Sequence, residues 1–199
     1  MELSRQQRAI VVGSLLGDAC LERNGKCYRL RMEHCDAQKE YVQWKCTMFA
    51  GLVSKASPME VNAFHQKQRR TYKSWRMYTR SSPLFREIEK QFYVGGRKIV
   101  PLDLRALLTD PLSLAVWFMD DGYKRNDCNA FRINTDSFTK KEQMLLQETL
   151  ATNFGIDSSV HQKGKYWNIY IPQSSSRRFV KVVKPHILPC LLYKIALAP

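Results

Sequence analysis

The sequence predicts an α+β protein made of two similar halves, and three observations lead to this fold class. An apolar helical segment that ends in a carboxylate occurs twice, as VVGSLLGDA at residues 11–19 and as LAVWFMDDG at residues 114–122. The same order of strands and helices follows each copy, as judged from the spacing of apolar residues. The strands alternate apolar side chains with basic or polar ones, which is the period of half-buried strands with one apolar face.

The first half begins with a helix over residues 3–20, because its apolar residues recur at helical spacing. Gly13 and Gly17 lie four residues apart on a strip of this helix and leave room for another backbone. Alternating side chains then predict a strand at residues 28–33. An acidic capping residue begins the next helix, which we expect over residues 36–53.

Two more strands are expected at residues 59–66 and 72–80, joined by the basic turn 67–70. On the second strand, odd-numbered residues such as Trp75 lie on one face, and even-numbered residues form an aromatic and basic face. A helix over residues 83–92 completes the half.

Gly95 and Gly96 indicate the boundary between the halves, which therefore span residues 1–96 and 97–199, with a linker at residues 97–110. The second half repeats the order of the first, and a proline suits the first turn of its motif helix. Its other expected elements are a strand at 131–135, a helix at 139–154, two strands around Gly164 and a helix at 176–186.

The charge of the chain favours a polyanionic partner. The formal net charge is +14, from 32 Lys and Arg against 18 Asp and Glu, and nucleic acid is the first candidate. The alternatives are a basic surface that is merely well solvated and an anionic membrane, but neither a long apolar run nor a basic amphipathic helix supports the membrane. The six cysteines include no C-x-x-C pair, and no apolar segment near the start resembles a secretory signal, so we expect a reducing compartment.

The acids at the ends of the two motif segments need an explanation. A carboxylate at the end of a buried apolar helix is costly unless it is paired, hydrogen-bonded or bound to a metal. If the halves face each other, a cation shared between Asp18 and the pair Asp120 and Asp121 explains them most simply. The alternatives are a structural hydrogen bond for Asp18 and an exposed acidic turn for the other two.

The two segments resemble the motifs of the LAGLIDADG homing endonucleases, in the intron-encoded branch where one chain carries both motifs. The second copy keeps Leu-Ala at its start and Asp-Gly at its end, whereas the first keeps the Asp but ends Gly-Asp-Ala. The similarity continues at NTDSFT (134–139) and PCLLYK (189–194) and spans nearly the whole chain. The resemblance implies two pseudo-symmetric α-β-β-α-β-β-α halves, whose antiparallel DNA-binding sheets form a saddle over the major groove.

The resemblance also implies the site residues. Aligned motif ends place Asp18 opposite Asp121 and Gly17 opposite Asp120, so we expect Asp18 and Asp121 to be the catalytic carboxylates. They would bind Mg²⁺, or Mn²⁺ in its place, and the carbonyls of Gly17 and Asp120 would be further ligands. Hard oxygen donors suit Mg²⁺, which can activate a water and stabilise both oxygens of a phosphodiester displacement.

Two lysines match active-site lysines of the family, one in each half. Lys98 lies in the linker, 23 residues before Asp121, and Lys194 lies in the closing motif. Either would stabilise the developing phosphorane charge or orient the water. The alternative for both is an ordinary solvated lysine. The histidines lack a paired metal spacing, and we assign none of them to chemistry: His34, His65, His161 and His186.

The candidates for DNA contact share a basic, amide or aromatic group on a predicted strand or turn. They are Arg29, Arg31, Arg69, Arg70, Lys73, Arg76, Arg80, Arg132, Asn134, Lys163, Lys165, Asn168 and Tyr170. Arginine binds guanine and asparagine binds adenine in the major groove, but many of these residues would contact only phosphate. For each of them, a solvated surface position is the alternative.

The sequence therefore predicts a monomeric, site-specific DNA endonuclease that makes a Mg²⁺-dependent staggered double-strand break in a long asymmetric double-stranded target and so initiates intron homing. The alternative is an intron RNA maturase, or a nucleic-acid binding protein of the same fold that does not cleave. The retained pair of acids favours cleavage. No membrane association is expected, and the family favours a mitochondrion or chloroplast, with the bacterial cytoplasm as the alternative.

Overall fold

A computed structural model describes residues 2–164 and 166–197. It is an α+β structure with two four-stranded antiparallel sheets, whose strand orders are β1-β2-β4-β3 and β7-β8-β10-β9. The chain divides into two compact units: unit 1 comprises Met1–Gln7 and Asp18–Glu89, and unit 2 comprises Arg8–Gly17 and Lys90–Pro199. The repeated strand order confirms the predicted α-β-β-α-β-β-α plan of each half.

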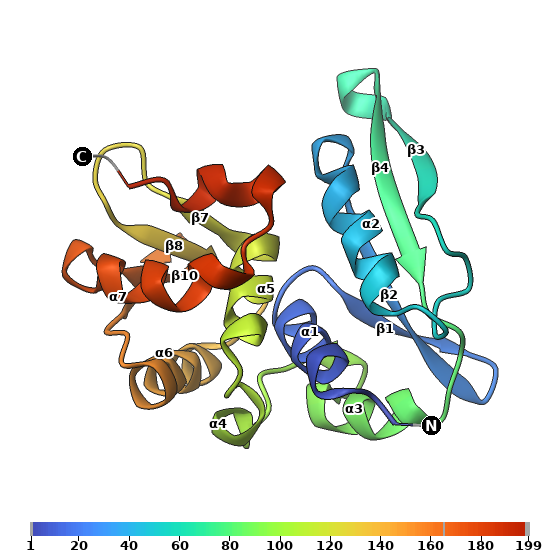
Figure 1. Cartoon of the computed structure of the whole chain (residues 1–199), viewed down its shortest axis with the longest axis horizontal. Helices are drawn as coiled ribbons and strands as arrows, with labels where there is room; N and C mark the ends of the chain where they lie inside the picture. Colours follow the sequence, from blue (N-terminus) through green and yellow to red (C-terminus); the bar gives the residue numbers. More distant parts are fainter. Residues whose placement is uncertain (1, 165, 198–199) are drawn as a thin grey trace. The chain divides into compact units, whose positions relative to one another are not determined.

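Unit 1 is built on the first sheet, with helix α2 across one of its faces (Figure 1). Its strands are β1 (Cys20–Asn24), β2 (Cys27–Cys35), β3 (Met59–His65) and β4 (Arg70–Tyr78). Its helices are η1 (Asp36–Gln38), α2 (Lys39–Met48), η2 (Gln66–Gln68) and most of α3 (Leu84–Phe92). Leu30, Met32, Trp75 and Met77 are buried, so the predicted alternation of β4 is confirmed.

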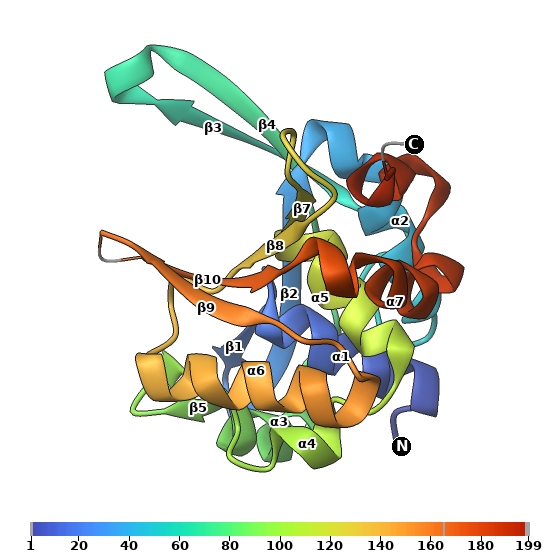
Figure 2. The ribbon, with the colours of Figure 1, turned by 90° about the vertical axis from the view of Figure 1, so that its left-hand side faces the viewer.

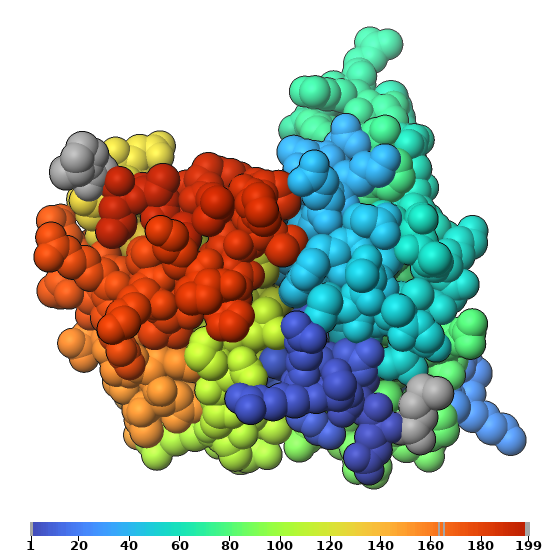
Figure 3. All heavy atoms as spheres, viewed as in Figure 1, coloured from blue at the N-terminus to red at the C-terminus, as the bar shows by residue number. Residues whose placement is uncertain are grey.

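The far end of the β3–β4 hairpin differs from the rest of unit 1. Every residue from 62 to 73 is exposed, and the hairpin end projects beyond α2 (Figures 2 and 3). Arg69 in its turn has a positive φ of 46°, which is uncommon for a residue other than glycine. This basic segment of the chain is therefore held away from any apolar core.

Unit 2 holds both motif helices, because α1 lies in it from Arg8 onward. Its helices are α1 (Arg5–Leu16), α4 (Leu104–Leu107), α5 (Pro111–Asp121), α6 (Lys140–Phe154), α7 (Gln173–Val183), η3 (Lys184–His186) and η4 (Pro189–Ile195). Its strands are β5 (Tyr93–Val94), β6 (Arg97–Lys98), β7 (Gly122–Lys124), β8 (Phe131–Asn134), β9 (Ser159–Lys163) and β10 (Tyr166–Ile171).

The helices of unit 2 begin with the capping residues that the sequence provides. Asp110 accepts a hydrogen bond from the Leu112 backbone N–H, and Pro111 follows it in the first turn of α5. Thr139 and Glu142 form a capping box at the start of α6. These local signals explain why both helices begin where the sequence predicts.

Helices α1 and α5 pack with their backbones almost in contact. A Cβ atom added to Gly13 would lie 2.3 Å from the carbonyl oxygen of Ser113 and 2.9 Å from the Cβ atom of Val116. No real Cβ atom tolerates such distances, so only glycine fits at this position. Residues Leu112–Asp120 of α5 are all buried, which accounts for the strongly apolar motif.

The structure differs from the sequence prediction in several places. The helix expected over residues 36–53 is the short η1 followed by α2, which ends at Met48, and Asp36 is not the capping residue of either. Strand β7 was not predicted. The first helix ends at Leu16 rather than at residue 20, and β1 follows as a separate strand. The linker contains the β5–β6 hairpin and α4. The last helix begins at Gln173 and ends at Val183, because a proline at 185 lacks the N–H that would continue it. The division of the sequence at residues 96 and 97 stays a prediction.

Among the described residues, none of the helices has both the length and the apolar character needed to span a bilayer.

Candidate active site and nucleic-acid interface

The first motif ends in a close contact with the second inside unit 2. The Gly17 N–H donates to the carbonyl oxygen of Gly13 at 3.1 Å and ends the helical hydrogen bonding of α1. A Cβ atom on Gly17 would lie 2.6 Å from the Cβ atom of Asp120. Gly17 therefore has to be glycine so that α1 can end beside Asp120. Asp18 follows Gly17 directly in the chain.

The three motif acids differ in exposure. The Asp18 side chain is 44% exposed, and its Oδ2 atom lies 3.4 Å from Nδ1 of His34 within unit 1. Asp120 is buried, whereas Asp121, the last residue of α5, is half-buried. Within the described ranges, no group of three or more His, Cys, Asp or Glu side chains could hold a metal ion by itself.

Each of the two predicted active-site lysines contacts a carbonyl oxygen at the end of a motif helix. Lys98 Nζ donates to the Gly17 carbonyl at 2.6 Å, and Lys194 Nζ donates to the Met119 carbonyl at 2.6 Å. Carbonyls at a helix C-terminus carry partial negative charge and favour a cation. Lys194 is 9% exposed, so it is not an ordinary solvated lysine.

The two lysine contacts are not equivalent. Lys98 binds the carbonyl directly before Asp18, whereas Lys194 binds the carbonyl before Asp120, which is one residue short of Asp121. Motif alignment alone gives no indication of this shift. The two halves therefore differ in register at the end of their motif helices.

Glu142 fixes the strand that carries Lys98. Its carboxylate accepts from the Arg97 guanidinium through two contacts of 3.3 Å and from the Val100 N–H at 3.1 Å. Burial would raise the pKa of Glu142, but the hydrogen bonds from Thr139, Arg97 and Val100 outweigh it and lower the pKa below its ordinary value. Sequence reasoning missed this role; the capping-box spacing was the only local signal for Glu142.

Several predicted DNA-contacting residues share one face of the unit 1 sheet, where acids hold them. Arg29 and Arg31 both contact Glu22, at 3.0 and 2.8 Å, and Arg76 Nε lies 2.7 Å from Glu33. Burial would raise the pKa of Glu33, yet the hydrogen bonds from Arg76 and Ser74 hold it below its ordinary value. These arginines are therefore oriented before any ligand binds.

The other predicted residues of unit 1 are placed differently. Arg69 and Arg70 lie in the exposed hairpin end, and Arg80 is exposed just after β4. Lys73 lies on the opposite face of β4 from Arg76, because side chains alternate along a strand, and its Nζ contacts Glu60 at 3.0 Å. The structure therefore does not bring Lys73 together with the arginines.

The exposed face of the unit 2 sheet collects most of the remaining predicted residues. The pairing registers place Arg132 opposite Tyr170, and Asn134 opposite Asn168. The Tyr170 ring stacks on His161 with centroids 4.6 Å apart, and the Arg132 guanidinium lies 5.8 Å from the Tyr170 ring centroid. Lys163 is the last residue of β9; Lys165 lies outside the described residues.

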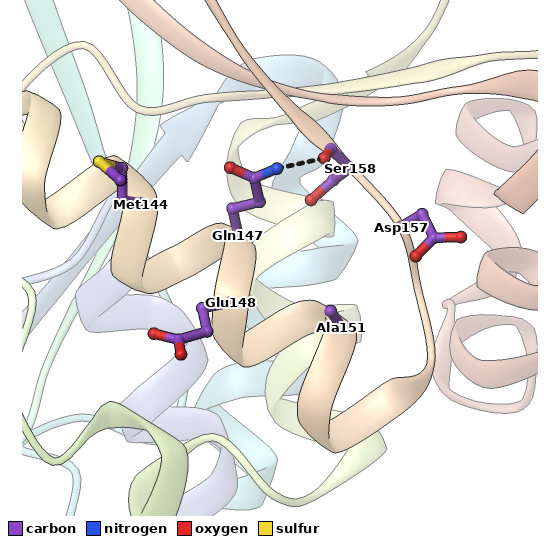
Figure 4. Close-up of a pocket in the computed structure, with 6 residues that line it drawn as sticks. All are labelled: Met144, Gln147, Glu148, Ala151, Asp157 and Ser158. Atoms are coloured by element: carbon purple, nitrogen blue, oxygen red, sulfur yellow. Dashed lines mark hydrogen bonds between the residues drawn. The ribbon is translucent and has the colours of Figure 1, made fainter.

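Unit 2 also has a surface pocket on α6, drawn in Figure 4. It measures about 450 Å³, and its lining residues are Met144, Gln147, Glu148, Ala151, Asp157 and Ser158. None of the predicted site residues lines it, and its two carboxylates make it unsuitable for a nucleic-acid phosphate.

Comparison with known proteins identifies the repeated motif. Residues 8–179 match the model of the LAGLIDADG DNA endonuclease family. The chain is 30% identical to DNA endonuclease I-ChuI of Chlamydomonas applanata, over 98% of this chain and 97% of that protein. It is 29% identical to the cytochrome b mRNA maturase bI2 of Debaryomyces hansenii, over 97% of this chain and 74% of that protein.

Solved structures agree with these sequence relatives. The homing endonuclease I-WcaI bound to its DNA recognition sequence superposes with a TM-score of 0.92 at 26% identity, covering 100% of this chain and 89% of that one. The fold also matches I-DmoI in complex with DNA and Mn, with a TM-score of 0.56 at 13% identity, over 88% and 94% of the two chains. The chain belongs to the LAGLIDADG DNA endonuclease family.

Proposed function

We propose that this chain is a homing endonuclease that makes a Mg²⁺-dependent staggered double-strand break in a long asymmetric DNA target. One observation carries the proposal. In unit 2 the close packing of α1 and α5 puts Gly17 against Asp120, and each of these residues directly precedes a motif acid, Asp18 and Asp121. Because Gly17 and Asp120 are in contact, the two acids that follow them in the chain are well suited to share a cation.

The donor set fits a divalent cation. Asp18 and Asp121 would hold Mg²⁺, or Mn²⁺ as a substitute, together with the carbonyl oxygens of Gly17 and Asp120; all are the hard oxygen donors that Mg²⁺ prefers. The Gly17 carbonyl already accepts a hydrogen bond from a cationic side chain, which supports its affinity for positive charge. The bound ion would activate a water and stabilise the attacking and leaving oxygens.

The lysines would act from the ends of the motif helices. Lys98 and Lys194 present ammonium groups at the C-termini of α1 and α5. An ammonium fixed there would stabilise the negative charge that develops on the phosphorane. Their contacts with helix carbonyls hold both groups in place without the cost of ordering them during the reaction.

The sheet faces would bind the DNA. The arginines of β2 and β4 and the Arg132–Tyr170 cluster supply donors for phosphates and base edges. The two halves present different residues, so the target need not be palindromic. We propose that the protein acts as a monomer in the organelle or cell whose genome carries its intron, a mitochondrion or chloroplast before a bacterial cytoplasm.

A second function is RNA binding as an intron maturase. The observation in its favour is the 29% identity to the Debaryomyces maturase over 97% of this chain. A maturase would bind the intron RNA that encodes it and would not need both motif acids. Cleavage of DNA and binding of that RNA are separate measurements on the same protein.

The test is cleavage of DNA that spans the joined exons flanking the host intron. We expect both strands to be cut with Mg²⁺, and Asp18→Asn or Asp121→Asn to abolish cutting while DNA binding stays nearly unchanged. Asp157→Asn, which removes an exposed acid from the pocket of Figure 4, is the matched control and should cut normally. Tight binding of this DNA without cutting, with either Mg²⁺ or Mn²⁺, refutes the endonuclease.

A further inference from the structure

Unit 1 contains a chain of three polar side chains that leads from its interior to Asp18. It begins at Lys45 on α2, passes through His34 on β2 and ends at the Asp18 carboxylate. Lys45 is 0% exposed, and the His34 side chain is 1% exposed, whereas the Asp18 side chain is 44% exposed. A fully buried ammonium is costly, so its contacts are informative.

Lys45 determines which nitrogen of His34 carries the proton. Lys45 Nζ lies 3.1 Å from Nε2 of His34 and 4.3 Å from the centre of the Tyr41 ring. An ammonium group only donates hydrogen bonds, so Nε2 has to accept with its lone pair. In a neutral imidazole that accepts in this way, the single proton is on Nδ1.

The proton on Nδ1 faces the motif acid. Nδ1 of His34 lies 3.4 Å from Oδ2 of Asp18. The imidazole cannot turn away freely, because it is buried and packs on the Tyr41 ring with centroids 4.9 Å apart. A ring nitrogen held in place therefore faces one oxygen of a carboxylate that is 44% exposed.

The second half lacks an imidazole at this place. In unit 1, Cys20 lies two residues after Asp18 and pairs with Arg31. In unit 2, Tyr123 lies two residues after Asp121 and pairs with Arg132. Arg132 is therefore the counterpart of Arg31, and Thr135, three residues later, is the counterpart of His34. The Thr135 hydroxyl donates to Oε1 of Gln143 at 2.6 Å, and the Gln143 amide donates back to the Thr135 carbonyl at 2.6 Å. Thr135 is therefore part of a buried hydrogen-bond pair inside unit 2.

We infer that His34 is a positioning residue for Asp18, with its tautomer set by the contact with Lys45. The effect on cleavage rests on the proposed function. The tautomer itself does not, because it belongs to the metal-free protein. Groups that orient a metal-binding carboxylate typically change metal affinity or rate by about 10- to 100-fold.

The first experiment measures the tautomer by long-range ¹H–¹⁵N correlation of the histidine rings, in protein without metal or DNA. His34→Gln identifies the His34 signals by their loss. We expect the Nδ1–H tautomer in the wild type and its loss in Lys45→Met, which keeps the side-chain length without the ammonium. An Nε2–H form in the wild type, or the same tautomer in both proteins, overturns the inference.

The second experiment follows the cleavage of each strand under single-turnover conditions with Mg²⁺. The double variant His34→Phe with Lys45→Met removes both polar groups, so no buried ammonium is left without an acceptor. Because Asp18 would share its cation with Asp121, we expect about 10- to 100-fold slower cutting of both strands. His34→Gln should restore most of the rate, because an amide both donates and accepts.

Thr135→Val is the matched control, since it damages a buried hydrogen bond at the equivalent place in unit 2. It should lower stability without slowing the cutting of either strand. Unchanged cutting in the double variant, or no rescue by glutamine, overturns the positioning role. If the wild type cuts no DNA, the proposed function fails, and the tautomer measurement still decides the geometry of His34.

Discussion

Gly13→Ala is the most direct test of the packing between the two motif helices. The added methyl group would lie 2.3 Å from the Ser113 carbonyl oxygen and 2.9 Å from the Val116 Cβ atom. The oxygen belongs to the backbone of α5 and cannot rotate away as a long side chain would. Relief of the clash therefore requires the helices to separate by about an ångström at a point where both are buried.

Two opposing effects set the size of the change. Alanine is a better helix former than glycine by about 1 kcal/mol, which would stabilise α1. Overpacking a rigid core costs about 1–3 kcal/mol and sometimes more, and a backbone obstacle puts this site at the upper end. The net loss should be about 2 kcal/mol, which corresponds to a fall in Tm of about 4–8 °C for a chain of this size.

Thermal unfolding followed by circular dichroism measures this loss. Ser14→Ala is the control from the next position of the same helix, because the buried Ser14 hydroxyl has no hydrogen-bond partner among the described residues. Its removal should leave Tm unchanged or slightly raised. If Gly13→Ala instead raised Tm by the helix-propensity gain, the close approach of α1 and α5 would be refuted.

Two further predictions concern charge. Glu142→Gln should destabilise the protein by about 1–2 kcal/mol at pH 7. The pKa of Glu142 in the folded protein lies below its ordinary value of 4.5. The stabilisation by this carboxylate is therefore present above pH 4.5 and is lost as the pH falls through the folded pKa. Urea unfolding at pH 7 and pH 3 checks this, and an unchanged difference would contradict it. Target DNA binding should weaken by about 10³-fold between about 50 and 200 mM salt; a flat response in a fluorescence anisotropy titration would exclude binding through phosphates.

Much of the fold could be predicted because local patterns and tertiary packing agree. The alternation of β4 places Trp75 and Met77 inside, and the capping box at Thr139 begins α6 as expected. Strand β1 was missed because its residues, Cys20–Asn24, show no alternation of apolar and polar types. The β5–β6 hairpin is too short for its pattern to be recognised.

The candidate site was predictable only in part. The motif predicts Asp18 and Asp121 as the catalytic acids. Nothing local to Lys98 predicts that its ammonium contacts the Gly17 carbonyl, since the two are far apart in sequence. The same holds for His34. Its inward parity with Leu30 and Met32 was visible, yet a histidine on an apolar strand face has no specific meaning until Lys45 is known to lie beside it.

The path of the chain between the compact units bears on how proteins of this design could be recombined. The chain passes from one unit to the other three times, after Gln7, after Gly17 and after Glu89. A cut at residue 96 would give a first fragment that carries α1 without α5, leaving the buried residues of α1 uncovered. Chimaeras that exchange the first sheet between relatives should therefore transplant Asp18–Glu89 as an insert and leave α1 with the recipient.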